Sequence, residues 1–104
     1  MPTRRVHDRY DVSLPVTILS GSSEVSGLTR NVGLGGMFIF TDFSAQFGDR
    51  VLLRLRLPAL REDSRIEATV RWVEPDGVGV QFGSLRAMEV WGLNQLLKAR
   101  PLSD

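Results

Sequence analysis

The chain has 104 residues, about the length of one ordinary domain with a single hydrophobic core. It contains no cysteine and one histidine, which excludes disulfides, thiolate metal sites and a centre built from several histidines. The net charge is +1, but Arg4, Arg5 and Arg9 lie close together, which favours a local anion site over an extended nucleic-acid surface. Because no apolar stretch has the length of a signal or membrane segment, we expect a cytoplasmic protein without membrane insertion.

The first half of the chain predicts four β-strands. Apolar and polar residues alternate over residues 12–18, with Pro15 at an edge or a bulge. A mostly exposed strand over residues 24–31 follows a turn, and the glycine cluster at 33–36 ends it. Residues 37–41 and 51–57 predict the next two strands, and Val51, Leu53, Leu55 and Leu57 are expected to face inward.

The second half predicts a hairpin and a helix. Residues 65–74 and 78–82 alternate on either side of a Pro-Asp-Gly turn, so we expect them to pair. From Ser84, a candidate N-cap, the apolar residues follow a helical period, and the predicted inward stripe consists of Leu85, Met88, Gly92, Leu93, Leu96 and Leu97.

Six short strands followed by one amphipathic helix predict a mainly β fold, a six-stranded antiparallel barrel with the helix packed across an opening or an edge. We divide this single domain into an N-terminal arginine-containing segment (1–11), the barrel (12–83) and the C-terminal helix (84–100). No nucleophile beside a base, carboxylate pair or metal-ligand set can be assembled from the sequence, which argues against an enzyme.

The strongest constellation for binding is the pair Arg5 and Arg9, four positions apart just before the first strand. Two such guanidinium groups can close on a ligand with several anionic oxygens, donating bidentately and stacking on a flat ring. Twelve of the thirteen basic residues are arginine, which is consistent with planar recognition of this kind. A lone pair at this spacing is common, however, so its significance depends on its context.

That context is Asn31-Val-Gly33-Leu-Gly35-Gly36. An Arg-x-x-x-Arg segment followed by an Asp/Asn-x-Ser-x-x-Gly turn resembles the bacterial PilZ domain family. The resemblance extends over most of the chain, because Arg-Arg-Val-His-Asp-Arg-Tyr-Asp-Val-Ser-Leu-Pro-Val is similar to the opening of the family. Leu-Gly-Gly-Met-Phe-Ile is similar to its second motif, and Val-Arg-Trp-Val-Glu with Gly-Val-Gly-Val-Gln-Phe to its closing hairpin.

The resemblance implies a six-stranded barrel that binds cyclic di-GMP, a bacterial second messenger, as its ligand and needs no cofactor or metal. By analogy, Arg5 and Arg9 would hold phosphates and stack on or bond a guanine, with Arg4 as a further donor. Asn31 would bond a guanine edge, and Gly36 would hold the turn that lets the base approach.

One position departs from the family pattern. Gly33 stands where the family has serine, so a hydroxyl that would help to fix the ligand or the turn is missing. The loss of one hydrogen bond typically costs about 0.5–1.5 kcal/mol of binding free energy. Gly33 could also make the loop more mobile. Both effects would weaken binding without abolishing it.

Trp72 has two interpretations. Its strand parity places it with Ile66, Ala68 and Val70 in the core, whereas its position near the end of a strand would let an aromatic ring reach the ligand. We include it among the candidate ligand-binding residues. Trp91 lies off the main helical stripe and would cover a barrel edge or meet a partner.

Three functions remain open. The leading one is a cyclic di-GMP receptor, a monomer or weak dimer, that signals to a protein partner in motility or biofilm regulation. The second is a degenerate PilZ-like adaptor that does not bind nucleotide, which Gly33 favours and the Arg5 and Arg9 pair opposes. The third is a small barrel for single-stranded nucleic acid, which the near-neutral charge opposes.

Overall fold

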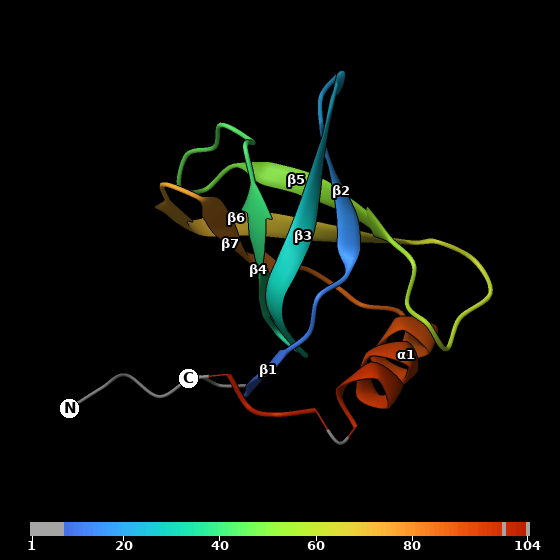
Figure 1. Ribbon diagram of the computed structural model, residues 1–104. Coiled ribbons are helices and arrows are strands. Elements are labelled where there is room, and N and C mark those ends of the chain that lie inside the picture. The colour runs from blue at the N-terminus through green and yellow to red at the C-terminus, as the bar shows by residue number, and fades with distance from the viewer. Residues whose placement is uncertain (1–7, 99, 104) are drawn as a thin grey trace.

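The computed structural model describes residues 8–98 and 100–103. In this part of the chain an antiparallel sheet is followed by one helix (Figure 1). In chain order, the elements are β1 (Arg9–Asp11), β2 (Pro15–Ser20), β3 (Ser23–Gly33), β4 (Gly36–Thr41), β5 (Arg50–Leu55), β6 (Ser64–Glu74), β7 (Gly77–Phe82) and α1 (Ala87–Leu97).

Six of these strands close into a barrel. Their order is β3-β2-β5-β6-β7-β4, and β4 pairs back with β3 to complete the ring. All of these pairs are antiparallel, so the predicted six-stranded antiparallel barrel is confirmed. The short strand β1 is added to the end of β3, and it lies in the segment for which no strand was predicted.

The core consists of the inward-facing side chains of alternate strand positions. In β5 the alternation places Val51, Leu53 and Leu55 inside, and Leu57 is buried just beyond the strand, as predicted. In β7 the alternation buries Val78, Val80 and Phe82, and the hairpin of β6 and β7 pairs as expected. The largest fully buried side chains of this core include Ile18, Met37, Ile39, Leu53, Leu57, Ile66 and Leu93.

The strand bounds near the glycine cluster differ from the prediction. β3 continues past Asn31 to Gly33, and β4 already begins at Gly36. Neither Gly33 nor Gly36 has a positive φ angle, so these glycines form strand ends and not a left-handed turn. Close approach of neighbouring backbone explains them instead, as described for the site below.

Of the two interpretations of Trp72, the structure contradicts the one that places its side chain in the core. The pairing of β6 with β7 shifts its register between Val70 and Trp72, which is the signature of a β-bulge. Because the extra residue reverses the parity of the strand, Val70 is fully buried whereas Trp72 is 37% exposed. The bulge therefore turns the indole out of the barrel interior.

The helix begins later than predicted, and its inward stripe is different. Arg86 occupies the N-cap position instead of Ser84, and Met88 is exposed. Glu89 is buried in its place, and its carboxylate accepts hydrogen bonds from the Arg86 backbone N–H at 2.9 Å and from the Arg86 guanidinium at 2.9 Å. The predicted burial of Gly92, Leu93, Leu96 and Leu97 is confirmed.

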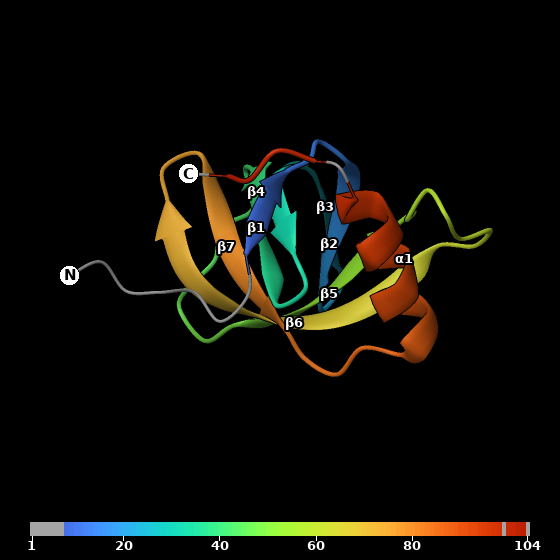
Figure 2. The same cartoon turned by 90° about the horizontal axis from the view of Figure 1, so that it is seen from below.

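Helix α1 lies at one end of the barrel, where Gly92 brings it close to the segment after β5. A Cβ atom at position 92 would lie 3.1–3.2 Å from side-chain atoms of Leu57 and Leu60, so the absence of a side chain permits this tight packing. Beyond the helix, residues 100–103 run back to β1 (Figure 2). In the described part of the chain, no helix has both the length and the apolarity needed to cross a membrane.

Candidate functional site

The site is built where β1 lies along the end of β3. The antiparallel register places Arg9 opposite Gly33, Tyr10 opposite Val32 and Asp11 opposite Asn31. Two sequence motifs that are separated by about twenty residues therefore become neighbours. Of the predicted arginines, only Arg9 is among the described residues, because Arg4 and Arg5 lie outside them.

Arg9 contacts two of the other predicted site residues. Its guanidinium donates a hydrogen bond to the side-chain oxygen Oδ1 of Asn31 at 3.3 Å. The centre of the same guanidinium lies 4.7 Å from the centroid of the Trp72 ring, within the distance of a cation–π contact. Arg9, Asn31 and Trp72 thus meet in one cluster formed by β1, β3 and β6.

The Trp72 ring is held by residues that the sequence analysis did not assign to the site. It stacks on Phe38 with ring centroids 6.4 Å apart and planes inclined by 24°. On β7, Gly79 lies opposite Trp72 in the ladder, and a Cβ atom there would overlap the indole. A ring that covers a glycine on the neighbouring strand is a known pairing in β-sheets. Here it could not be found from the sequence, because the bulge before Trp72 shifts the register by one residue.

A further arginine lies beside this aromatic pair. The Arg30 guanidinium is 5.6 Å from the ring centroid of Phe38, so Arg9 and Arg30 each lie on one member of the Phe38–Trp72 stack. Arg30 directly precedes Asn31, at a register shift between Thr29 and Asn31 in the pairing of β3 with β4. Among the described residues, the cluster therefore contains two guanidinium groups, those of Arg9 and Arg30, and the two stacked rings of Phe38 and Trp72 that they contact.

Gly33 is required by the approach of β1. A Cβ atom at position 33 would clash with the backbone carbonyl oxygen of Asp8 and would lie 3.3 Å from Cγ of Arg9. A serine here would have to push the start of β1 away from β3. Gly33 does not lie in a loop, as expected from the sequence, but within the ladder of β3, where it is buried.

Gly36 has a similar role on the other side of β3. It is the first residue of β4, and a Cβ atom there would clash with the backbone carbonyl oxygen of Val80 in β7. Residues 34–35 form the bend between β3 and β4 and Gly36 follows it directly, so the role of Gly36 in holding the turn for the base stays a prediction. Gly36 lets β4 and β7 pair closely at the end of the barrel that carries the cluster.

The C-terminal tail also reaches the cluster, which the sequence analysis missed. The backbone N–H of Ser103 donates to the Arg9 carbonyl at 2.8 Å, and that of Asp11 donates to the Pro101 carbonyl at 2.9 Å. The side-chain Nδ2 of Asn31 donates to Oγ of Ser103 at 3.4 Å. No local sequence pattern marks these contacts, because they join the two ends of the chain.

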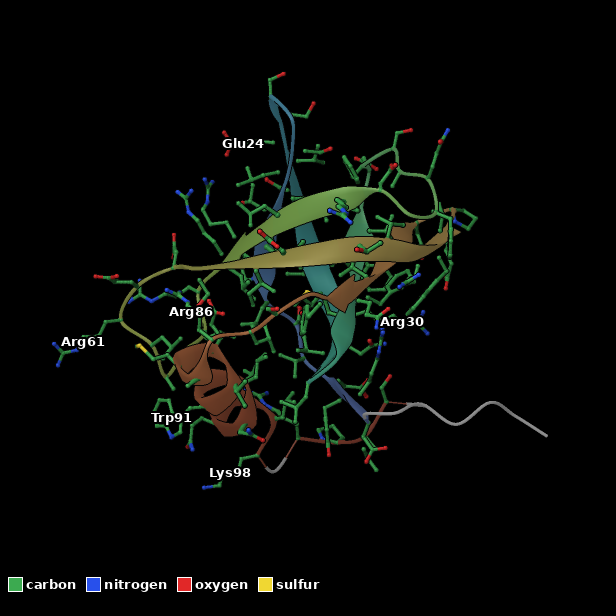
Figure 3. The ribbon with its side chains drawn as sticks, turned by 180° about the vertical axis from the view of Figure 1, so that it is seen from behind. Glu24, Arg30, Arg61, Arg86, Trp91 and Lys98 are labelled. Atoms are coloured by element: carbon green, nitrogen blue, oxygen red, sulfur yellow. The ribbon has the colours of Figure 1, made fainter. Side chains whose placement is uncertain are left out.

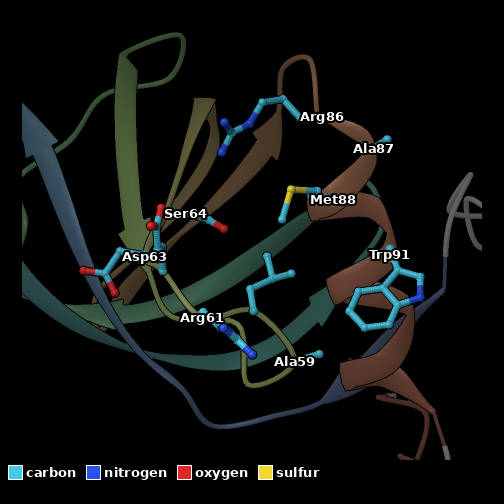
Figure 4. Close-up of a pocket in the computed structure, with 10 residues that line it drawn as sticks. Ala59, Arg61, Asp63, Ser64, Arg86, Ala87, Met88 and Trp91 are labelled. Carbon is cyan, nitrogen blue, oxygen red and sulfur yellow. The ribbon is translucent and has the colours of Figure 1, made fainter.

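A separate groove of about 710 Å³ lies between the loop after β5 and the start of α1 (Figure 4). Its lining includes the exposed side chains of Met88 and Trp91, two acidic residues, Glu62 and Asp63, and two basic residues, Arg61 and Arg86. Figure 3 shows Trp91 on the opposite side of the view from Arg30, so the groove is distinct from the arginine cluster. These two acidic and two basic side chains balance in charge, so the groove suits a ligand with two phosphates less well than the arginine cluster does.

Neither feature is a metal centre, since the described residues include no group of three or more histidine, cysteine, aspartate or glutamate side chains that could hold a metal ion. The arginine cluster has the composition of an anion site, with guanidinium donors, an amide that can both donate and accept, and a flat aromatic ring. This combination suits a ligand that carries both phosphates and a planar base.

Known structures share this architecture. The PilZ domain of CeSA from a cellulose-synthesizing bacterium matches with a TM-score of 0.70 and 18% identity, over 86% of this chain and 93% of that one. The PilZ domain of Escherichia coli YcgR, solved with c-di-GMP, matches with a TM-score of 0.71 and 12% identity, over 91% of this chain and 89% of that one. At these identities the two structures support the fold.

A third similar structure is the Bacillus subtilis inhibitor of motility, MotI/DgrA. Its TM-score is 0.71 and its identity 27%, and the match covers 95% of this chain but only 55% of that one. The chain thus spans about half the length of this relative. A comparison with curated proteins found no match.

The sequence itself matches the model of the PilZ domain over residues 3–98. This range includes both the Arg-x-x-x-Arg segment and the Asn31–Gly36 motif, as well as the whole barrel. The closed barrel, the cluster at the end of β3 and the sequence match agree, and the chain belongs to the PilZ domain family.

Proposed function

We propose that this chain is a non-catalytic receptor for cyclic di-GMP, and that ligand binding changes its N-terminal segment and the adjacent surface to signal to a protein partner. PilZ domains form a family of receptors for this ligand, and the similar YcgR structure contains it. The observation that carries the proposal is the convergence of Arg9, Asn31 and Trp72 at the end of β3.

The chemistry of the cluster fits that of the ligand. Cyclic di-GMP carries two phosphates and two guanines. Arg9 can donate to a phosphate or to O6 and N7 of a guanine, which is the pairing arginine makes with guanine in DNA grooves. Asn31 offers an amide to the guanine edge, and the face of Trp72 now covered by Arg9 suits a stacked base.

The proposed site also includes two arginines, Arg4 and Arg5, that lie outside the described residues. We assign Arg5 to a phosphate and a guanine together with Arg9, and Arg4 to an additional phosphate contact. Because these residues directly precede β1, their engagement by the ligand would reposition the segment that leads into Arg9. A partner that contacts this segment would then sense the ligand, and the likeness to an inhibitor of motility favours a role in motility or biofilm control.

Isothermal titration calorimetry with cyclic di-GMP tests the proposal. We expect saturable heat with one or two ligand molecules per chain, and much weaker binding of GMP, which has one phosphate and one guanine. An absence of heat up to high micromolar cyclic di-GMP would contradict receptor function.

A second candidate is an adaptor that binds a protein partner without nucleotide. Two observations favour it: Gly33 lacks the hydroxyl of the family motif, and the amide of Asn31 has protein partners at both its oxygen and its nitrogen. Under this alternative, Arg9 would serve to fix β1 and nothing else. The titration above separates the two functions, since only the receptor gives heat.

A further inference from the structure

The C-terminal tail adds a strand-like edge to the face that carries Arg9. Tyr10 and Leu102 form an antiparallel bridge, so β1 lies between β3 on one side and the tail on the other. The backbone bonds from Ser103 to Arg9 and from Asp11 to Pro101 belong to the same pairing. In this register Ser103 lies opposite Arg9, and Gly33 lies opposite Arg9 on its other edge.

Residues that are directly opposite in neighbouring strands project from the same face of a sheet. Ser103 therefore shares the face of Arg9, whereas Leu102 projects from the reverse face, where it is 59% exposed. The contact of the Ser103 hydroxyl with Asn31 at 3.4 Å is consistent with this orientation. A hydroxyl from the end of the chain thus lies against the amide that we assign to the guanine edge.

We propose that Ser103 is a ligand-binding residue of the nucleotide site, and that the tail of residues 101–103 forms one wall of it. The inference rests on the proposed cyclic di-GMP function. A hydroxyl that accepts a bond from the Asn31 amide can donate its own proton to a guanine or phosphate oxygen. Gly33 has no side chain and no space for one, so Ser103 supplies a hydroxyl to a site whose own β3 motif lacks it.

The tail also positions Arg9. Its Ser103 N–H bond holds the carbonyl of Arg9, and its Pro101 carbonyl holds the N–H of Asp11, one residue beyond Tyr10. β1 has only three residues, so these bonds fix a substantial part of its backbone. Binding a ligand to Arg9 is favoured when the strand is already ordered, because less conformational entropy is lost.

The opposite role for the tail makes a different prediction. If Ser103 occupied the site in competition with the ligand, its removal would free Asn31 and tighten binding. If the tail is a wall of the site, removing the Ser103 hydroxyl should weaken binding of the ligand. If Ser103 competes with the ligand, the same change should strengthen it. The sign of the change in affinity therefore decides between them.

The experiment compares the full chain with Ser103→Ala by calorimetric titration with cyclic di-GMP. We expect the dissociation constant to rise by about two- to twelvefold, the range for one hydrogen bond. Ser84→Ala is the matched control, because Ser84 is exposed and precedes α1, and it should bind like the wild type.

A second variant removes residues 101–104. It should lose at least tenfold in affinity, because both the hydroxyl and the bonds to β1 disappear, while circular dichroism should retain the spectrum of the barrel. Unchanged or tighter binding by Ser103→Ala would overturn this inference and leave receptor function intact. Failure of the wild type to bind cyclic di-GMP would overturn the proposed function, and this inference with it.

Discussion

The guanidinium of Arg9 lies 4.7 Å from the ring centroid of Trp72, although one residue comes from β1 and the other from the far end of β6. The contact exists because a bulge turns Trp72 out of the barrel and because β1 pairs with the end of β3. Arg9 also donates to Asn31, so a single arginine links the three elements of the site.

Asn31 is expected to contribute to base selectivity. Because its Oδ1 accepts from Arg9, the group that Asn31 can offer to a base is the Nδ2 donor, which suits O6 of guanine, whereas adenine carries an amino donor, N6, at that position. Asn31→Ala should therefore lower affinity for cyclic di-GMP by about 5- to 150-fold, the equivalent of about 1–3 kcal/mol for a lost specific base contact, with a smaller change for cyclic di-AMP.

Parallel titrations of both nucleotides check this prediction. Thr29→Ala is unsuitable as a control, because the Thr29 hydroxyl bonds to the backbone of residues 12 and 14. Ser26→Ala, at an exposed position of the same strand, is the better control. Equal losses for the two nucleotides would show that Asn31 does not read the base.

Gly33→Ser should not restore the family site in this chain. The added Cβ would clash with the carbonyl oxygen of Asp8, so β1 must move away from β3 and carry Arg9 with it. We expect a loss of about 1–3 kcal/mol of stability, the typical cost of overpacking, and weaker nucleotide binding. Chemical denaturation and calorimetric titration measure the two effects.

The matched control is Gly83→Ser. A Cβ atom at Gly83 would lie 3.4 Å from the nearest atom, which is an ordinary contact, and the residue is exposed. This variant should be close to the wild type in both measurements. If Gly33→Ser were as stable as the wild type and bound nucleotide more tightly, the close approach of β1 would not be the reason for the glycine.

Gly79→Ala should displace Trp72 without removing it. Because a Cβ at position 79 would overlap the indole, the ring must leave its place on β7 and its stack with Phe38. We expect the binding free energy for cyclic di-GMP to become less favourable by about 1–3 kcal/mol, the usual contribution of stacking a base on an aromatic side chain.

Near-ultraviolet circular dichroism reports the displacement of the ring. The measurement is best made in a Trp91→Phe background, because Trp91 is exposed on α1 and would otherwise contribute to the signal. Gly83→Ala again provides the control. A changed Trp72 signal together with unchanged affinity in Gly79→Ala would exclude a role for the ring in binding.

The barrel could be predicted from the sequence because its signals are local. Along β5 and the two residues after it, every second position from Val51 to Leu57 is apolar, and the structure buries each of the four. The same rule fails at Trp72, since a bulge adds one residue to the strand and reverses the parity after Val70. The apolar pattern also fails at the start of α1. There Arg86 is the N-cap and hydrogen-bonds to the carboxylate of Glu89, so a charged residue is buried where the pattern predicts an apolar one.

The site could be predicted only in part. Arg9, Asn31 and Trp72 are identified by the resemblance to the family, and the structure brings them together. The close approach at Gly33 and the contact of Ser103 with Asn31 depend on which strands pair, and no local pattern in either segment encodes that choice. Arg30 was missed because strand parity alone does not reveal its position beside Phe38.

The most direct test of the account is the affinity of the Arg9→Ala variant for cyclic di-GMP beside that of the wild type. Arg9 is the residue that joins β1, Asn31 and Trp72, so we expect its removal to weaken binding by at least tenfold. Arg54→Ala removes the same charge from an exposed pair with Glu24 and should leave affinity unchanged. Saturable binding by the wild type that Arg9→Ala preserves in full would contradict the proposed site.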